Sequence, residues 1–198
     1  MFRKFNCIEG CSDCCVKREY FPSRKFGKIG VLLLPEEKGM IEQTAKKMKV
    51  NVTILPRIGV GTNDDNSGPK SVLVYQLMGM DKEGNVCPFL DREGIERSPH
   101  GGARCKIYDK RPLACKAYPV VDFDHASSML DSRCTYCVSN NAISAGNSGL
   151  TGEIEALKKI MADTYVSAGT EIWRYATNVG DPYTGEMLPE GWIKAKVT

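Results

Sequence analysis

Residues 7–15, CIEGCSDCC, hold four of the nine cysteines of this 198-residue chain. Three of the four follow a C-x3-C-x2-C spacing and the last comes directly after: Cys7, Cys11, Cys14 and Cys15. A two-residue gap lets one tight turn direct two sulfurs toward the same ion, which is why it recurs in zinc and iron–sulfur sites. A second such pair, Cys134 and Cys137, lies far along the chain. Three chemistries fit this crowding: disulfides, zinc or an iron–sulfur cluster.

The size of the chain and its predicted compartment make disulfides the weakest of the three. A chain of this length buries roughly 70% of its unfolded surface, so a hydrophobic core alone can hold the fold. Positive charge near the N-terminus is not followed by an apolar segment, so we expect no export and a cytoplasmic localisation. In a reducing cytosol several cysteines indicate metal or redox chemistry, and their odd number also disfavours a purely paired design.

Charge and hydropathy limit the partners. The net charge of +3 is small and no lysine–arginine block concentrates it, so we expect no nucleic-acid partner. The longest apolar run, VLLL at residues 31–34, is far shorter than the ~20 residues of a membrane span. We expect instead a protein partner, whose identity the sequence does not give.

Local patterns predict short elements separated by loops. Pro35 suits the first position of a helix over residues 35–49, and two glutamates follow it at the positive end of the helix dipole. Ile41, Ala45 and Met48 fall on one face of that helix. Strands are predicted at 28–35, at 51–60 with a proline interrupting it, at 71–80 and at 118–124. A turn at 81–85 is predicted to pair the strand at 71–80 with residues 86–90 as a hairpin. The remaining predicted elements are loops at 61–70 and 92–102 and a short helix at 112–118.

The C-terminal part carries the strongest helical period. After a linker at residues 140–149, a helix is predicted over residues 151–179, with one apolar stripe for core packing or docking: Ile154, Leu157, Met161, Tyr165 and Ala168. Residues 181–198 are expected to form a loose tail that Trp192 pins. The predicted fold is α+β: a small irregular domain of short strands and helices organised around cysteine-ligated metal, with a C-terminal helix. The predicted domains are 1–138 for metal binding and 139–198 for the linker, helix and tail.

All nine cysteines are candidate metal ligands: Cys7, Cys11, Cys14, Cys15, Cys87, Cys105, Cys115, Cys134 and Cys137. In extended chain the adjacent Cys14 and Cys15 would point to opposite sides, so they serve two sites or one of them is not a ligand. His100, in a polar loop, and His125, beside an aspartate, are interpreted as solvated histidines.

The C-x3-C-x2-C spacing is also the signature of radical S-adenosylmethionine enzymes. Those enzymes carry an aromatic residue just before the last cysteine, where Asp13 stands here, and only six residues precede Cys7. The chain is also short for their partial α/β barrel and shows no repeated βα pattern. This class is therefore ranked below a simpler metal-binding protein.

Two later segments extend the cysteine pattern. CPFL at residues 87–90 and CKIYDKRPLACKAYP at residues 105–119, together with CIEGCSDCC, resemble the YkgJ-like cysteine-cluster family of zinc- or iron-chelating domains. The resemblance spans residues 7–137, with Lys116 where arginine is common in the family. It implies eight ligands, the eighth being Cys134 or Cys137. One relative, the flagellin lysine N-methylase, is associated with an iron–sulfur cluster and S-adenosylmethionine, but nothing further here completes such a catalytic unit.

Three residues of the second segment are candidates for binding the cofactor without ligating metal. The Arg111 guanidinium can donate to carbonyls or cluster sulfurs and offset thiolate charge. Tyr108 and Tyr118 can shield the site and donate from their hydroxyls. Ordinary core and turn packing is the alternative for all three.

The expected function is that of a metal-binding, iron–sulfur protein with a redox, sensing or accessory role in a larger enzyme system. The expected cofactor is one or two 4Fe-4S clusters, because structural zinc sites use two C-x2-C pairs close in sequence. Zinc, in a structural module that binds a partner, is the alternative. A second alternative is an iron–sulfur-dependent methyltransferase or radical enzyme. The sequence identifies no catalytic residue, substrate, redox potential or oligomeric state.

Overall fold

The computed structural model describes residues 6–16, 30–61, 67–79, 86–91, 93–140, 142, 144–176 and 191–195. Contacts divide the chain into two compact units, each of which is described by itself. The cysteine unit comprises Met1–Lys17 and Phe89–Asp163, and the sheet unit comprises Arg18–Pro88 and Thr164–Thr198. The division at residue 138 drawn from the sequence stays a prediction.

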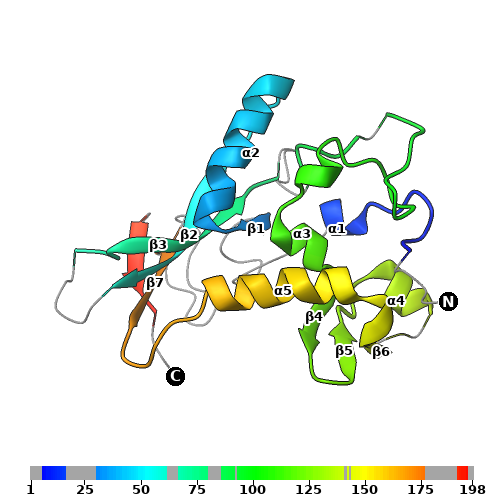
Figure 1. Ribbon diagram of the computed structural model, residues 1–198. Coiled ribbons are helices and arrows are strands. Elements are labelled where there is room, and N and C mark those ends of the chain that lie inside the picture. The colour runs from blue at the N-terminus through cyan, green and yellow to red at the C-terminus, as the bar shows by residue number, and fades with distance from the viewer. Residues whose placement is uncertain are drawn as a thin grey trace. The chain divides into compact units, whose positions relative to one another are not determined.

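The sheet unit is built on a five-stranded antiparallel sheet in the order β1-β3-β2-β7-β8 (Figure 1). Its strands are β1 (Val31–Leu33), β2 (Ile54–Gly61), β3 (Ser71–Leu77), β7 (Glu171–Ala176) and β8 (Gly191–Lys194). The register of β2 against β3 shifts on both sides of Ile58. Pro56 lies next to this irregularity, as expected for a residue without a backbone N–H in a strand.

Helix α2 (Pro35–Met48) belongs to the same unit and begins at the predicted residue. The Leu34 N–H donates to a Glu37 carboxylate oxygen at 3.0 Å, which satisfies one backbone donor at the helix start. Ile41 and Ala45 are buried, as predicted, whereas Met48 is 37% exposed and does not join the core. The helix ends at Lys49 in the left-handed region (φ 55°).

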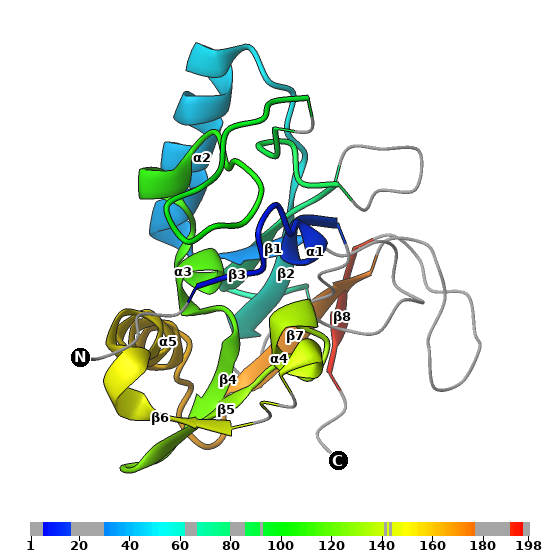
Figure 2. The ribbon, with the colours of Figure 1, turned by 90° about the vertical axis from the view of Figure 1, so that its right-hand side faces the viewer.

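The cysteine unit contains a three-stranded antiparallel sheet with helices beside it (Figure 2). The strands are β4 (Val120–Phe123), β5 (Ser127–Leu130) and β6 (Ser144–Gly146). The helices are α1 (Asp13–Val16), α3 (Leu113–Ala117), α4 (Thr135–Ser139) and α5 (Thr151–Asp163), with 3-10 turns at Tyr108–Lys110 and Asn147–Gly149. Helix α5 packs on α3 and β4. Six buried residues form the core of this unit: Val120, Leu130, Cys134, Cys137, Leu150 and Ile154.

The predicted long C-terminal helix is wrong in its second half. Helix α5 ends at Asp163, and residues 171–176 form β7 instead. Gly169, between the two, adopts a positive φ of 84° that breaks the helical period. Pairing of the segment EIWRYA with β2 overrides its local helical pattern, as the apolar and aromatic content of this segment allows. The buried stripe ends before the helix does, because Met161, still within α5, is 52% exposed, and Tyr165, beyond the helix, is 78% exposed.

Three other expectations are corrected. Strand β3 does not form a hairpin with residues 86–90: it pairs with β1 and β2, and Leu90 makes an isolated bridge to Cys105. The linker at 140–149 contains β6. The tail contains β8, in which the Trp192 ring packs edge-on against Tyr175 of β7 at 5.3 Å. The turn predicted at 81–85 and most of the loop at 61–70 lie outside the described residues.

The remaining local predictions are confirmed. The short helix at 112–118 corresponds to α3, and the strands at 28–35 and 118–124 correspond to β1 and β4. The mixture of helices and antiparallel strands confirms the α+β class. Among the described helices, none combines the length and apolarity that crossing a bilayer requires.

Candidate metal centre

Five thiols face one cavity of about 70 Å³ in the cysteine unit. They come from three separate parts of the chain: the N-terminal segment, α3 and the start of α4. The cysteines that line the cavity are Cys7, Cys11, Cys14, Cys115 and Cys134. All nine cysteines of the chain are thiols in this structure. The cavity therefore collects sulfur donors that are distant in sequence.

Backbone hydrogen bonds hold the N-terminal segment against the loop at residues 98–103. The Cys7 N–H donates to the His100 carbonyl at 2.7 Å, and the Ala103 N–H donates to the Cys11 carbonyl at 2.8 Å. The approach is close at Gly102: a β-carbon there would lie 3.0 Å from the Cys11 carbonyl oxygen and 2.9 Å from His100 Nε2. Any larger residue would push the two cysteine-bearing segments apart. Glycine is required here by proximity.

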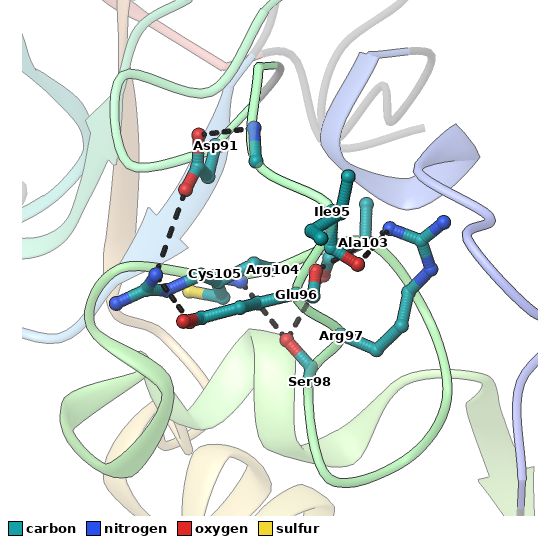
Figure 3. Close-up of polar contacts among 9 residues, drawn as sticks. Asp91, Ile95, Glu96, Arg97, Ser98, Ala103, Arg104 and Cys105 are labelled. Atoms are coloured by element: carbon teal, nitrogen blue, oxygen red, sulfur yellow. Dashed lines mark hydrogen bonds and ion pairs between the residues drawn. The ribbon is translucent and has the colours of Figure 1, made fainter.

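The loop that leads to Cys105 is closed by the Ser98 side chain (Figure 3). The buried Ser98 hydroxyl donates to the Ala103 carbonyl at 2.9 Å and accepts from the Cys105 N–H at 2.9 Å. The Arg104 guanidinium pairs with Glu96 on the same loop. These contacts fix Cys105 at the end of the loop, partly buried, although Cys105 is not among the residues that line the cavity.

Adjacent cysteines in α1 have different surroundings. Cys14 and Cys15 lie in a helical turn and not in extended chain, and their sulfurs are 4.0 Å apart. Because successive helical side chains diverge by about 100°, the two thiols face different directions. Only Cys14 lines the cavity.

The two cysteines of the second C-x2-C pair differ in their access to the cavity. Both cysteines belong to the buried core of the unit, but Cys134, the N-cap residue of α4, also lines the cavity, whereas Cys137, 1% exposed, does not. The family resemblance left either cysteine as the eighth ligand, and of the two only Cys134 lies at the cavity.

Burial raises the pKa of three cysteines of this unit: Cys7, Cys105 and Cys137. Burial, followed by the neighbouring Cys11, Cys14 and Cys134, raises the pKa of Cys7 to about 12. Burial and then Cys134 raise the pKa of Cys137 to about 12. Burial raises the pKa of Cys105, against the lowering effects of the Ile107 backbone and of Arg111. A metal that binds thiolates here must therefore displace protons.

The three predicted cofactor-binding residues also line the cavity: Tyr108, Arg111 and Tyr118. The Arg111 guanidinium carbon lies 3.7 Å from the centre of the Tyr108 ring, and Arg111 Nε donates to the Tyr108 carbonyl at 3.0 Å. The Pro112 that follows Arg111 favours its extended backbone (ψ 141°). This position brings positive charge to a cavity rich in thiols. The role of Tyr108, Arg111 and Tyr118 in binding a cofactor stays a prediction.

His100 is not the solvated residue that the sequence suggested. It lines the cavity, its ring stacks on Tyr108 with 5.3 Å between centroids, and its buried Nδ1 has no hydrogen-bond partner among the residues that the structure describes. Burial and then Arg111 lower the pKa of His100 below its usual value. The feature of the sequence that could have indicated the position of His100 is the Gly-Gly pair that follows it, because glycine permits close approach of another backbone segment. His125 is exposed, as predicted.

The remaining candidates are not shown to share the cavity. Cys15, Cys105 and Cys137 belong to the cysteine unit but do not line it, and Cys87 belongs to the sheet unit. Among the described residues, no three His, Cys, Asp or Glu side chains are arranged to hold a single ion. The set of nine ligands therefore stays a prediction.

Comparison with known proteins identifies the family. Residues 6–138, more than half of the chain, match the family model CxxCxxCC, described as "Putative zinc- or iron-chelating domain". No curated protein and no solved structure matches the chain. The matched range contains every cysteine and every residue that lines the cavity except Glu153. The chain belongs to the CxxCxxCC family of metal-chelating domains.

Proposed function

We propose that this protein holds an iron–sulfur cluster in the thiol-lined cavity and uses it for electron transfer or redox sensing, as an accessory to a larger enzyme system. The observation that carries the proposal is the gathering of five thiols from three parts of the chain around one cavity. Family membership supports metal binding in general and leaves the choice between zinc and iron open.

The donor set fits a thiophilic metal. Thiolates are soft ligands that select zinc, copper(I) and iron–sulfur clusters over hard cations. The residues that would hold the metal are the five at the cavity: Cys7, Cys11, Cys14, Cys115 and Cys134. A bound iron–sulfur cluster would supply one-electron redox chemistry.

The arrangement of the thiols favours a cluster over a single structural zinc. Structural zinc sites use both sulfurs of each C-x2-C pair, whereas only Cys134 of the second pair lines this cavity. The arrangement here, with three sulfurs from the N-terminal segment and one each from α3 and the start of α4, is closer to that of cluster-binding proteins.

The chain's own residues would tune such a centre. The Arg111 guanidinium stabilises added negative charge and so favours the reduced form. The stacked rings of His100 and Tyr108 exclude water from one side of the cavity. Four of the five thiols are partly buried and Cys134 is buried, which restricts access of oxygen and external reductants and suits electron exchange with a docked protein.

Metal and sulfide analysis of anaerobically purified protein tests the proposal. We expect a brown protein with iron and acid-labile sulfide in equal amounts, whose visible absorbance bleaches on reduction. A colourless protein with stoichiometric zinc and no sulfide would contradict the proposal and support a structural zinc module. Titration with S-adenosylmethionine is a second arm: binding would support an enzyme in place of an electron carrier.

A further inference from the structure

We propose that His100 supplies a nitrogen ligand to the metal of the thiol-lined cavity. The inference rests on the proposed function only in requiring a metal there; it holds for iron or zinc. Neither the resemblance to the family nor the family description includes a histidine.

Backbone contacts place His100 beside Cys7. The His100 carbonyl accepts the Cys7 N–H at 2.7 Å, so the two residues are fixed relative to each other. Their side chains converge at Gly102: a β-carbon there would lie 2.9 Å from His100 Nε2 and 3.5 Å from Cys7 Sγ. The imidazole and the first thiol of the motif therefore face the same small space at the edge of the cavity.

One nitrogen of the partly buried imidazole lacks a hydrogen-bond partner in the described part of the chain. A neutral imidazole has one donor and one acceptor nitrogen, and both are usually satisfied in a protein interior. His100 Nδ1 is buried and has no hydrogen-bond partner in the described part of the chain. A metal ion is one partner that can satisfy a ring nitrogen, and imidazole suits both zinc and iron.

The imidazole ring is held in a fixed orientation. Stacking on Tyr108, with an interplanar angle of 19°, holds the plane of the imidazole. Histidine ligands usually donate their other N–H to a carbonyl or carboxylate, which fixes the tautomer. His100 Nε2 and the Cys11 carbonyl oxygen both lie close to Gly102, at 2.9 and 3.0 Å from the position of a β-carbon there. This arrangement resembles the surroundings of a ligand more than those of a packing residue.

A neutral nitrogen donor also suits the charge of the cavity. Five thiolates around one centre would carry a large negative charge, against the cations Arg111 and Lys116 in the lining. Replacing one thiolate by imidazole reduces this excess. In iron–sulfur centres the replacement of cysteine by histidine raises the reduction potential.

X-ray absorption at the metal edge tests the inference, because imidazole gives a characteristic multiple-scattering pattern that thiolate, water and carboxylate do not. The chain has two histidines. In the variant His125→Ala the remaining imidazole is that of His100, and His125 is exposed in the turn between β4 and β5. We expect imidazole scattering, with a nitrogen shell at about 2.0 Å for zinc, in the wild type and undiminished in His125→Ala.

The variant His100→Cys completes the design, since it keeps a donor and exchanges nitrogen for sulfur. We expect its metal content to stay near that of the wild type while imidazole scattering falls from one ligand per centre to none. Absence of imidazole scattering in metal-loaded His125→Ala, or its persistence in His100→Cys, would overturn the inference. Metal content is measured first: wild-type protein without bound metal would contradict the proposed function, whereas bound metal with a sulfur-only shell contradicts the role of His100 alone.

Discussion

The Thr135 hydroxyl donates a hydrogen bond to the Asp13 carboxylate, joining residues 122 positions apart. Asp13 lies between Cys11 and Cys14, and Thr135 follows Cys134 directly. Both residues line the cavity with these cysteines. This bond therefore fastens the N-terminal cysteine segment to the start of α4, and it fixes the distance between thiols from opposite ends of the family motif.

Replacing Thr135 by valine should loosen this connection at nearly constant volume. We expect the free energy of unfolding to fall by about 1 kcal/mol, because the partly buried Asp13 carboxylate loses a hydrogen-bond donor. Metal affinity should fall as well, since the thiols are no longer held together in advance. Urea unfolding and competition with a metal chelator measure the two effects. Thr170→Val, which removes a hydroxyl from an exposed pair with Ser167, is the matched control; equal effects in the two variants would contradict this role.

Substitution of the two cysteines of the second C-x2-C pair, Cys134 and Cys137, should have different effects. Cys134→Ser puts a favourable N-cap residue at the start of α4 but removes a cavity thiol, so the metal content per protein should drop with little loss of helix α4. Cys137→Ala should instead keep the metal and lower the free energy of unfolding by roughly 1–2 kcal/mol, because it leaves a void in the core. Metal analysis and urea unfolding of both variants give the comparison. Equal metal loss in both would show that Cys137 is also a ligand.

Helix α2 ends with a strained residue. Lys49 adopts φ 55° and ψ 36°, and its N–H bonds back to the carbonyls of Ala45 and Lys46. Lys49→Gly removes the steric conflict of the left-handed conformation, so the free energy of unfolding should rise by roughly 0.5–1 kcal/mol. Lys47→Gly, two residues earlier inside the helix, should lower it by about 1 kcal/mol. Chemical denaturation of both variants checks the opposite signs; destabilisation by Lys49→Gly would refute the strain.

Asp124 makes stability depend on pH at the β4–β5 turn. Its carboxylate accepts N–H bonds from Ser127 and Ala126, both at 2.7 Å, and these bonds lower the pKa of Asp124. Because the folded-state pKa lies below the unfolded one, the stabilisation is complete above the unfolded pKa and is lost as the pH falls through the folded pKa. The destabilisation caused by Asp124→Ala should therefore be largest at neutral pH and shrink in acid.

Denaturation midpoints of wild type and Asp124→Ala, measured from neutral to acidic pH, give the difference in stability between the two proteins. Asp122→Ala removes a nearby carboxylate that accepts one hydrogen bond from the next residue, Phe123, and is the control. A difference between wild type and Asp124→Ala that does not change with pH would contradict the assignment.

Local sequence determined the elements whose signals are local. Pro35 and the glutamates after it begin α2, and the spacing of Ile41 and Ala45 selects its buried face. The cysteine motif and the segment around CKIYDKRPLACKAYP were sufficient to identify the family over residues 6–138. These features depend on neighbours within a few residues, so a linear pattern contains them.

Only the tertiary structure decided which residues meet at the cavity. Cys134 and Cys137 have the same spacing as Cys11 and Cys14, yet Cys137 packs in the core because the strands and α5 around it come from distant parts of the chain. His100 reaches the cavity through backbone bonds to a segment more than ninety residues earlier. Similarly, residues 171–176 become a strand because the edge of β2 offers unpaired backbone groups. Contacts of this kind depend on long-range pairing and burial, which no local period records.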